Sequence, residues 1–366
     1  MARPLVAHVD LAALASNLAR ARDLAPGAVV FAVVKANAYG HGVVRVLPAL
    51  ADADGLALIE LDAALRLRAA GYRRPILLLE GFFDPRELDE IAAHSLAIVV
   101  HDLEQLQMLE RARLSRPLET WVKVNTGMNR LGLAPSDVAA VCARLEATGA
   151  AAPLRLMMHF ACADEAGGIA EPLARFEEAC RGLPYARSLA NSAGVVRYGE
   201  TGGAIVRPGI MLYGATPFAD RSAADLGLAP AMTLRSSLIG VQTLEAGGRV
   251  GYGSTYTAAG PMRIGVVACG YADGYPRHAP NGTPVIVAGR RVGTAGRVSM
   301  DMLTVDLSDV PQAGVGSEVV LWGEGLPVDE VAAAAGTIGY EMLCAVAQRV
   351  AFATASPPPD AAKFEE

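Results

Sequence analysis

Lysine is rare in this chain, and two of its lysines stand where an amine could do chemistry. Of the 32 Lys and Arg residues, 29 are arginines, and the lysines are Lys35, Lys123 and Lys363. Lys35 and Lys123 lie in apolar, strand-like segments, FAVVKANA and ETWVKVNTG. An arginine stays protonated inside a protein, whereas a lysine amine can lose its proton and become a nucleophile or a base. Both lysines are therefore candidates for amine chemistry, although ordinary snorkelling side chains would also explain them.

A second set of polar and small residues stands at or after the ends of predicted strands. A desolvated lysine can form a Schiff base with an aldehyde, and a serine hydroxyl with nearby backbone N–H groups can bind a phosphate. Together they indicate a phosphorylated aldehyde as cofactor. Each residue alone has an ordinary explanation, since a lone histidine is usually structural and a serine often caps a helix. The residues are Arg130, His159, Asn191, Ser192, Arg207, Gly209 and Ile210.

The elements that must position these residues alternate between strands and helices from residue 10 to about 225. Amphipathic stretches such as 84–94 and 135–149 read as helices between short β-rich runs. This alternation predicts an α/β fold that begins with a TIM-like (β/α)₈ barrel, in which active sites lie at the carboxyl ends of the strands. The predicted strands are 29–36, 55–60, 75–81, 96–100, 118–125, 153–160, 186–192 and 204–214.

The pattern changes after residue 225, and residues 226–355 predict a separate, mainly β domain that residues 1–9 join. Glycine becomes frequent there, and runs such as 262–270 and 317–323 read as strands. The exception is VDEVAAAAG, a short helix with Asp329 or the preceding turn as its cap. The Pro-rich, polar tail, residues 356–366, is expected to be disordered.

The composition excludes several classes of protein. A net charge of −6 without a basic stripe argues against nucleic acid as a partner, and no apolar run reaches the length of about 18 that a membrane span needs. The N-terminus lacks a leader pattern and the five cysteines are scattered, so we expect a cytoplasmic protein with free thiols and no metal site. The cysteines are Cys142, Cys162, Cys180, Cys269 and Cys344.

Short motifs along nearly the whole chain resemble those of alanine racemases. The segment around Lys35 is similar to the cofactor-lysine signature of that family, and the segment around Tyr252 is similar to its tyrosine motif. The remaining motifs follow in the same order at matching spacings. The segments are AVVKANAYGHG, KVNTGMNRLG, MMHFACADE, ANSAG, RPGIMLYG, GYGSTYTA, GYADGYPR, GRVSMDM and GYEMLCAVAQRV.

The resemblance implies an isomerase that binds pyridoxal 5′-phosphate and interconverts L- and D-alanine with two bases. Lys35 would carry the cofactor and act as one base, and Tyr252 would be the base on the opposite face. Racemisation breaks Cα–H on one face and remakes it on the other, so two opposed bases suffice. The resemblance also implies a cofactor-binding set, most of it for the phosphate, made of Tyr39, His159, Asn191, Ser192, Gly209, Ile210 and Tyr340.

Other residues receive supporting roles from the resemblance. Arg207 would face the pyridine nitrogen, which it cannot protonate, and this would make the ring a weaker electron sink. His159 would hydrogen-bond Tyr252, and Arg130 would contact the substrate carboxylate. Lys123, carbamylated in many relatives, would orient Arg130 by a charge-assisted hydrogen bond. The entrance and carboxylate end of the pocket would be shaped by Tyr271, Met300 and Asp301.

In this family the tyrosine reaches the cofactor of the other subunit, so the resemblance implies a head-to-tail homodimer with two shared sites.

Two positions depart from the family pattern. Ser188 stands where a histidine commonly contacts the pyridine-facing arginine, so we expect Arg207 to be held differently. Asn125 stands where an aspartate is frequent.

Three other functions are considered. A broad-specificity amino-acid racemase would share the architecture, but those relatives are typically exported. A barrel decarboxylase with the same cofactor would carry an acidic residue at the pyridine nitrogen, where this chain has Arg207. A non-catalytic cofactor-binding barrel would usually lack the second domain and Tyr252.

Overall fold

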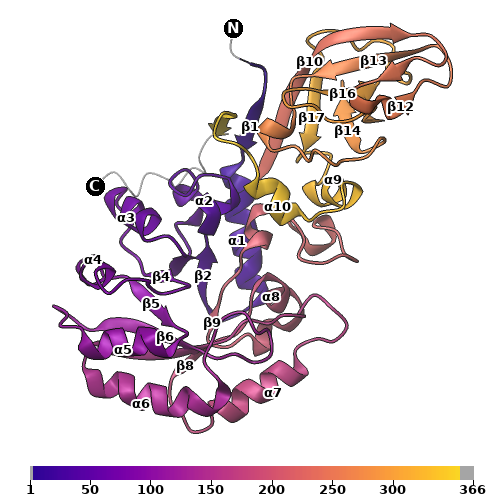
Figure 1. Cartoon of the computed structure of the whole chain (residues 1–366). Helices are drawn as coiled ribbons and strands as arrows, with labels where there is room; N and C mark the ends of the chain where they lie inside the picture. The colour runs from indigo at the N-terminus through magenta and orange to yellow at the C-terminus, as the bar shows by residue number, and fades with distance from the viewer. Residues whose placement is uncertain (1–2, 355–366) are drawn as a thin grey trace.

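The computed structural model describes residues 3–354, which form a barrel and an adjoining β domain (Figure 1). Eight parallel strands close the barrel in chain order, and most of their residues are buried and apolar. This confirms the predicted (β/α)₈ barrel followed by a mainly β domain. The barrel strands are β2 (Val29–Val33), β3 (Gly55–Leu58), β4 (Ile76–Leu78), β5 (Ala97–Val100), β6 (Leu118–Lys123), β7 (Ala151–Met157), β8 (Ala186–Ser188) and β9 (Ile205–Val206).

Amphipathic helices surround the barrel and bury one face each. In α5, for example, Leu106 and Leu109 are buried on the face toward the strands. The first helix is capped by Asp10, whose carboxylate accepts the N–H groups of Ala12 at 2.9 Å and Ala13 at 3.0 Å. The helices are α1 (Leu11–Leu24), α3 (Leu61–Ala69), α4 (Glu87–Ala93), α5 (Leu103–Arg111), α6 (Val138–Thr148), α7 (Ala170–Ala179) and α8 (Ser192–Tyr198), with 3₁₀ turns η1 (Leu47–Leu50), η2 (Pro135–Asp137), η3 (Gly199–Thr201) and η5 (Ala224–Leu226).

The last predicted barrel strand, 204–214, was wrong in its second half. The strand β9 ends at Val206, and residues Ile210–Tyr213 form the 3₁₀ helix η4. Pro208 cannot donate a hydrogen bond to a strand ladder, and Gly209 departs from strand geometry with φ −122° and ψ −94°. The apolar run IMLY therefore packs as a helical turn beneath the barrel mouth.

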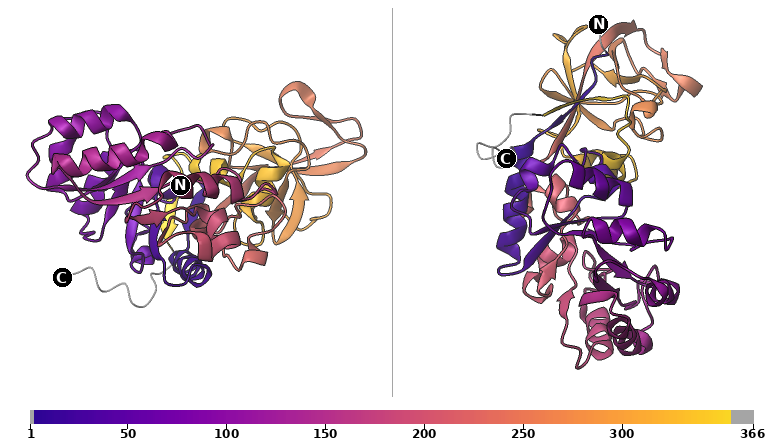
Figure 2. Two further views of the ribbon diagram at one scale, coloured as in Figure 1. Left: turned by 90° about the horizontal axis from the view of Figure 1, so that it is seen from below. Right: turned by 90° about the vertical axis from the view of Figure 1, so that its left-hand side faces the viewer.

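The β domain is built around the long strand β10 (Met232–Leu244). The sheet runs in the order β15, β14, β17, β10, β1, β18, and β13 pairs with both β10 and β16. Figures 1 and 2 show this domain beside the barrel. The N-terminal strand β1 (Val6–Val9) lies antiparallel to β10 and parallel to β18. The other elements are β11 (Arg249–Val250), η6 (Tyr252–Ser254), β12 (Tyr256–Thr257), β13 (Met262–Val267), η7 (Tyr271–Asp273), β14 (Pro284–Val287), β15 (Arg290–Gly293), β16 (Leu303–Asp306), β17 (Glu318–Trp322), α9 (Val328–Ala334), α10 (Gly339–Cys344) and β18 (Ala351–Thr354).

The sequence predicted that either Asp329 or the preceding turn caps the short helix, and the Asp329 side chain does not cap it. The helix α9 follows Pro327 in the preceding turn, which has no side-chain cap. Instead, the Asp329 carboxylate accepts the N–H of Thr216 at 2.9 Å and so joins α9 to the segment that leaves the barrel. Burial of Asp329 raises the pKa of its carboxyl to about 6.

The predicted first strand, 29–36, ends early because the chain reverses directly after Val33. The short element α2 (Lys35–Tyr39) contains four consecutive residues with positive φ, 49–57°, and none of them is glycine. A left-handed conformation costs about 1–2 kcal/mol for each such residue. The N–H of Gly40 donates to Ala36 at 3.0 Å, and that of Gly42 donates to Asn37 at 2.8 Å, so hydrogen bonds within the turn offset part of this cost.

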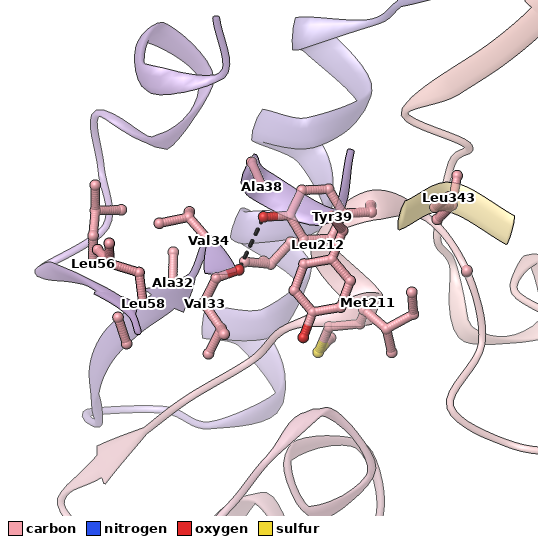
Figure 3. Close-up of a cluster of buried hydrophobic side chains, with 14 of the residues drawn as sticks. Ala32, Val33, Val34, Ala38, Tyr39, Leu56, Leu58, Met211, Leu212 and Leu343 are labelled. Carbon is pink, nitrogen blue, oxygen red and sulfur yellow. Dashed lines mark hydrogen bonds between the residues drawn. The ribbon is translucent and has the colours of Figure 1, made fainter. Parts of the chain in front are cut away.

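The left-handed turn also packs tightly against the β domain. Figure 3 shows Ala38 and Tyr39 in the cluster of buried side chains between β2 and η4, close to Leu343 of α10. Gly40 makes the closest approach, since a Cβ placed on it would lie 2.1 Å from the carbonyl oxygen of Leu343. Only glycine fits at that position, and α10 is thereby held over the turn.

Within residues 3–354, no helix is both long enough and apolar enough to span a bilayer. The expectation of disorder for residues 356–366 lies outside the described residues.

We expect Gly40→Ala to lower the midpoint of thermal unfolding more than Gly27→Ala. Both glycines have positive φ, 81° and 76°, so each alanine adds a similar backbone strain of about 1 kcal/mol. Only the alanine at Gly40 would meet another atom, because nothing lies within 4 Å of a Cβ at Gly27. Forcing such a contact costs a further 1–3 kcal/mol, roughly. Circular dichroism during heating measures both shifts, and equal shifts would contradict this packing.

Candidate active site

A cavity of about 920 Å³ lies at the carboxyl ends of the barrel strands and is closed on one side by α10. It brings together the sequence-predicted residues of the barrel and one from the β domain. A site of this size and place suits a cofactor with a small substrate. The predicted residues that line it are Lys35, Tyr39, Lys123, Arg130, His159, Asn191, Ser192, Arg207, Gly209, Ile210 and Tyr340.

Positive charge dominates the cavity. Four cationic side chains line it, Lys35, Lys123, Arg130 and Arg207, against the three carboxylates of Glu80, Asp164 and Glu341. Burial, together with the positive charges of Arg207 and Arg130, lowers the pKa of Lys123 to about 8. Such a concentration of cations favours a ligand that carries anionic groups, such as a phosphate and a carboxylate.

Arg207 lies buried under the cavity floor and is held by Ser188. Its guanidinium donates to the Ser188 hydroxyl and, at 2.6 Å, to the carbonyl of Met158. The Ser188 hydroxyl in turn donates to the carbonyl of Ile205 at 2.9 Å. Burial lowers the pKa of Arg207 to about 10, so the side chain stays positive at neutral pH. The serine therefore supplies the different contact to Arg207 that was expected from its departure from the family pattern.

A cradle of hydroxyl and backbone N–H groups lies at one end of the cavity. The Ser192 hydroxyl accepts the N–H of Gly209 at 2.8 Å, and Ile210 begins η4, so its own N–H has no acceptor within that helix. A Cβ at Gly209 would lie 2.6 Å from the Tyr39 hydroxyl, so the phenol closely approaches the glycine backbone. The ring of Tyr340 lies 6.1 Å from that of Tyr39. Three hydroxyls and glycine backbone so arranged fit a phosphate group.

His159 and Asn191 lie side by side at the cavity wall. The Asn191 carbonyl oxygen accepts the N–H of Gly194 at 2.9 Å and caps α8, and its amide lies 3.4 Å from the His159 Nε2. Burial, with the nearby positive charges of Arg207 and Arg130, keeps the pKa of His159 well below its ordinary value. The imidazole is therefore neutral and can both donate and accept a hydrogen bond.

Apart from Tyr340, the predicted site residues of the β domain do not line the cavity of their own chain. Tyr252 begins η6 and is 70% exposed, while Met300 is 52% and Tyr271 is 39% exposed. The residues that line the cavity within 3–354 do not include any of these. One chain therefore does not bring Tyr252 to Lys35, and three large apolar side chains remain on the surface of the β domain.

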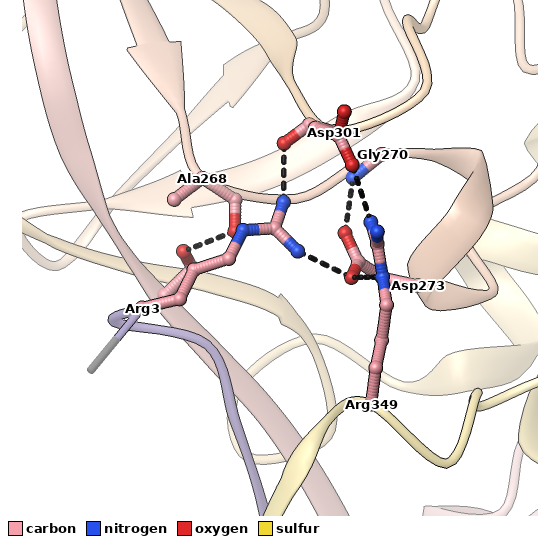
Figure 4. Close-up of polar contacts among 7 residues, drawn as sticks. Arg3, Ala268, Gly270, Asp273, Asp301 and Arg349 are labelled. Atoms are coloured by element: carbon pink, nitrogen blue, oxygen red, sulfur yellow. Dashed lines mark hydrogen bonds and ion pairs between the residues drawn. The ribbon is translucent and has the colours of Figure 1, made fainter.

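Asp301 belongs to a polar cluster that joins the loops carrying Tyr271 and Met300 (Figure 4). Its carboxylate accepts from Arg349 at 2.6 Å, and its carbonyl accepts from Arg3. Both arginines also pair with the fully buried carboxylate of Asp273, which accepts the N–H of Gly270 at 2.8 Å. The cluster ties both chain termini of the described region to these loops and fixes their shape.

Sequence reasoning missed Asp273, Arg3 and Arg349 of this cluster, as well as several residues that line the cavity. His101 directly follows β5, and Glu80 follows β4 by two residues, so the rule that placed Lys35 at a strand end applied to both. The His101 Nε2 lies 3.1 Å from the Glu80 carbonyl. The GYADGYPR motif, which contains Asp273, was the only feature of the local sequence that pointed to the polar cluster.

Two family descriptions match the chain, "Alanine racemase, N-terminal domain" over residues 9–217 and "Alanine racemase, C-terminal domain" over residues 231–354. Curated relatives include the alanine racemases of Nitrosospira multiformis, 56% identical over 353 residues, and Paraburkholderia phytofirmans, 55% identical over 351 residues. Each alignment covers 96% of this chain and 99% of the relative.

Solved structures agree with these matches. The biosynthetic alanine racemase of Pseudomonas aeruginosa superposes with a TM-score of 0.93 at 50% identity, over 97% of this chain and 100% of that one. The alanine racemase of Acinetobacter baumannii superposes with a TM-score of 0.90 at 38% identity, over 96% of this chain and 100% of that one. Both halves match over almost their full length, and the chain belongs to the alanine racemase family.

Proposed function

We propose that this chain is a pyridoxal-phosphate-dependent isomerase that interconverts L-alanine and D-alanine. The observation that carries the proposal is the cavity in which Lys35 lies with a phosphate cradle, in a chain 56% identical to an alanine racemase. The excess of cationic side chains around the cavity supports the binding of a phosphate and of an amino-acid carboxylate.

The cofactor would be held at both of its ends. The Nζ of Lys35 would bind its aldehyde carbon, and Tyr39, Ser192, Tyr340 and the Gly209–Ile210 backbone would bind its phosphate. Arg207 would face the pyridine nitrogen with His159 and Asn191 nearby. When bound, pyridoxal phosphate draws electrons from the substrate Cα and makes its hydrogen acidic. The cationic side chains that line the cavity suit the negative charge of the cofactor phosphate.

Two bases on opposite faces would move the proton. Once the substrate amine had displaced it from the cofactor, the Lys35 Nζ would take the Cα proton on one side, and the Tyr252 hydroxyl would give a proton on the other side, or the reverse. The configuration at Cα then inverts, and no atom is gained or lost. Neutral His159 would hydrogen-bond Tyr252, and Arg130 would orient the substrate carboxylate by a charge-assisted hydrogen bond.

We further propose a head-to-tail homodimer in which Tyr252 of one subunit completes the cavity of the other. The 70% exposure of Tyr252 and its absence from the lining of its own chain's cavity support this arrangement. Tyr271 and Met300 would then narrow the partner's pocket toward a methyl side chain, with Asp301 behind them.

We propose that the enzyme works in the cytoplasm and that it either supplies D-alanine for peptidoglycan or takes part in the catabolism of D-alanine. The five cysteines are unpaired thiols, which suits a reducing compartment. A decarboxylase is less well supported, because Arg207 occupies the place at which it would need an acid, and release of CO₂ from an amino acid would reveal one. A broad-specificity racemase is less well supported because Tyr271, Met300 and Tyr340 would crowd any side chain larger than a methyl group. Racemisation assays on alanine, serine, lysine and arginine test that preference.

Lys35→Ala is expected to abolish both racemisation and the visible absorbance of the bound cofactor, since no other amine lies at the end of β2. The spectrum of the purified protein, followed by L-to-D conversion, measures both effects. Lys123→Ala is the matched control, because it removes the other buried lysine and should keep the visible band. Loss of the band in Lys123→Ala alone would contradict the assignment of Lys35.

Tyr252→Ala is expected to slow loss of the Cα proton from L-alanine by roughly 100-fold or more, as removal of a general base does, and to affect D-alanine much less. The two rates of deuterium exchange in heavy water measure this asymmetry. Tyr256→Phe, a change at a neighbouring tyrosine of β12, serves as control and should leave both rates unaltered. An equal loss with both enantiomers would sink the two-base assignment.

We expect Lys123 to be carbamylated in an amount that rises with pH. Its pKa of about 8 leaves the amine protonated below that pH, and only the neutral amine attacks CO₂ and releases a proton. The anionic product would pair with Arg130. Carbon-13 NMR in labelled bicarbonate should show a carbamate signal that grows from pH 7 to 9 and is absent from Lys123→Ala. A signal of equal size in both proteins would refute the site.

A further inference from the structure

The turn that carries Lys35 contains a buried histidine that the proposed function does not use. His41 is fully buried, and its Nδ1 lies 3.0 Å from the Ala38 carbonyl oxygen and 2.9 Å from the Tyr39 carbonyl oxygen. Both neighbours can only accept a hydrogen bond, so Nδ1 must carry the proton. Its Nε2 has no hydrogen-bond partner among residues 3–354. Burial lowers the pKa of the imidazole to about 4, which keeps it neutral.

The two carbonyls that His41 binds belong to the left-handed turn itself. Ala38 and Tyr39 have φ of 57° and 49°, a conformation that only surrounding contacts can maintain in residues other than glycine. The backbone N–H of His41 also donates to Ala38 at 3.0 Å. One side chain and its own backbone therefore tie the end of the turn together. Without the imidazole N–H, the buried Tyr39 carbonyl would lose this donor.

The imidazole also belongs to a group of three packed rings. The ring of Tyr213 lies 4.7 Å from that of His41 and 4.6 Å from that of Tyr39. The Tyr213 hydroxyl donates to the carbonyl of Val33 at 2.9 Å, the last residue of β2. In Figure 3 Tyr39 lies in this buried cluster beside the end of the strand. The packed rings thus fix the turn to the barrel.

The turn sets the position of two groups that the proposed function needs. Lys35 is its first residue, and the Tyr39 hydroxyl lies against Gly209 in the phosphate cradle. A change in the turn would therefore move the phosphate-binding phenol and the lysine together.

We infer that His41 is a positioning residue for the cofactor, whose neutral Nδ1–H form locks the left-handed turn and so places the Tyr39 hydroxyl toward the phosphate. The inference rests on the proposed function, because it assumes that the cradle binds the phosphate of pyridoxal phosphate. His41 itself touches neither substrate nor reacting atoms in this account.

Two variants test separately the contributions of the imidazole N–H group and of the packed ring. His41→Asn keeps an amide N–H close to the place of Nδ1, and His41→Phe keeps a ring without a donor. The cofactor is removed from each purified enzyme with hydroxylamine, and pyridoxal phosphate is then titrated back while the visible absorbance is recorded. We expect the Kd of His41→Phe to rise about tenfold, the effect of one lost buried hydrogen bond, and that of His41→Asn to stay within about threefold of the unaltered enzyme.

A second readout reports on the turn directly. Hydrogen exchange of the peptide spanning residues 34–42 should become faster in His41→Phe and stay near its original rate in His41→Asn. Phe176→Leu is the control, since it disturbs a buried ring of α7 outside the cavity and should change neither the Kd nor this exchange. If His41→Phe does not fold, His41→Gln replaces it, because its longer side chain shifts the amide away from both carbonyls.

An unchanged Kd and unchanged exchange in the donor-free variant would overturn the inference, as would equal weakening in His41→Asn and His41→Phe. Failure of the unaltered enzyme to develop a visible band with pyridoxal phosphate would instead overturn the proposed function.

Discussion

The reversal of the chain directly after β2 is the constraint on which the cavity depends. Four left-handed residues turn the backbone back on itself, with Lys35 at the start and Tyr39 at the end. Gly40 lets this turn touch the carbonyl of Leu343, and that contact brings α10 and Tyr340 over the barrel mouth. The strained segment thus links a barrel strand, the phosphate cradle and the β domain. Strain of this kind persists only where the surrounding structure over-determines it.

Charge is the second constraint on the cavity. Lys123 and Arg207 are largely removed from water, and each carries a lowered pKa for that reason. Arg207 is stabilised by Ser188 and by backbone carbonyls rather than by a carboxylate. An anionic ligand would balance the positive charges of such a cavity. A cofactor phosphate and an amino-acid carboxylate would provide two anionic groups. These hydrogen bonds hold the charged Arg207 without a carboxylate partner, so no acid would lie at the place proposed for the pyridine nitrogen.

Short sequence patterns predicted the elements whose formation depends on the hydrophobicity of neighbouring residues. Hydrophobic runs located all eight barrel strands, and the strand-end rule placed Lys35, Lys123 and His159 at the same mouth. The left-handed turn could not be predicted, because only Asn37 among its four positive-φ residues has a tendency toward that conformation, and Ala36, Ala38 and Tyr39 do not. The helical turn η4 looked like strand because a short apolar run fits both forms. Asp273 was missed since its partners, Arg3 and Arg349, come from opposite ends of the chain.

In the proposed head-to-tail dimer, each working site needs the Lys35 turn of one chain and the Tyr252 segment of the other. Chains carrying Lys35→Ala or Tyr252→Ala alone would be combined under two different affinity tags, so that heterodimers can be isolated. A shared site predicts about half of the original activity per heterodimer, because one site receives both changes and the other receives none. If each site were built within a single chain, the heterodimer would be as inactive as its parents, and that result would contradict the account.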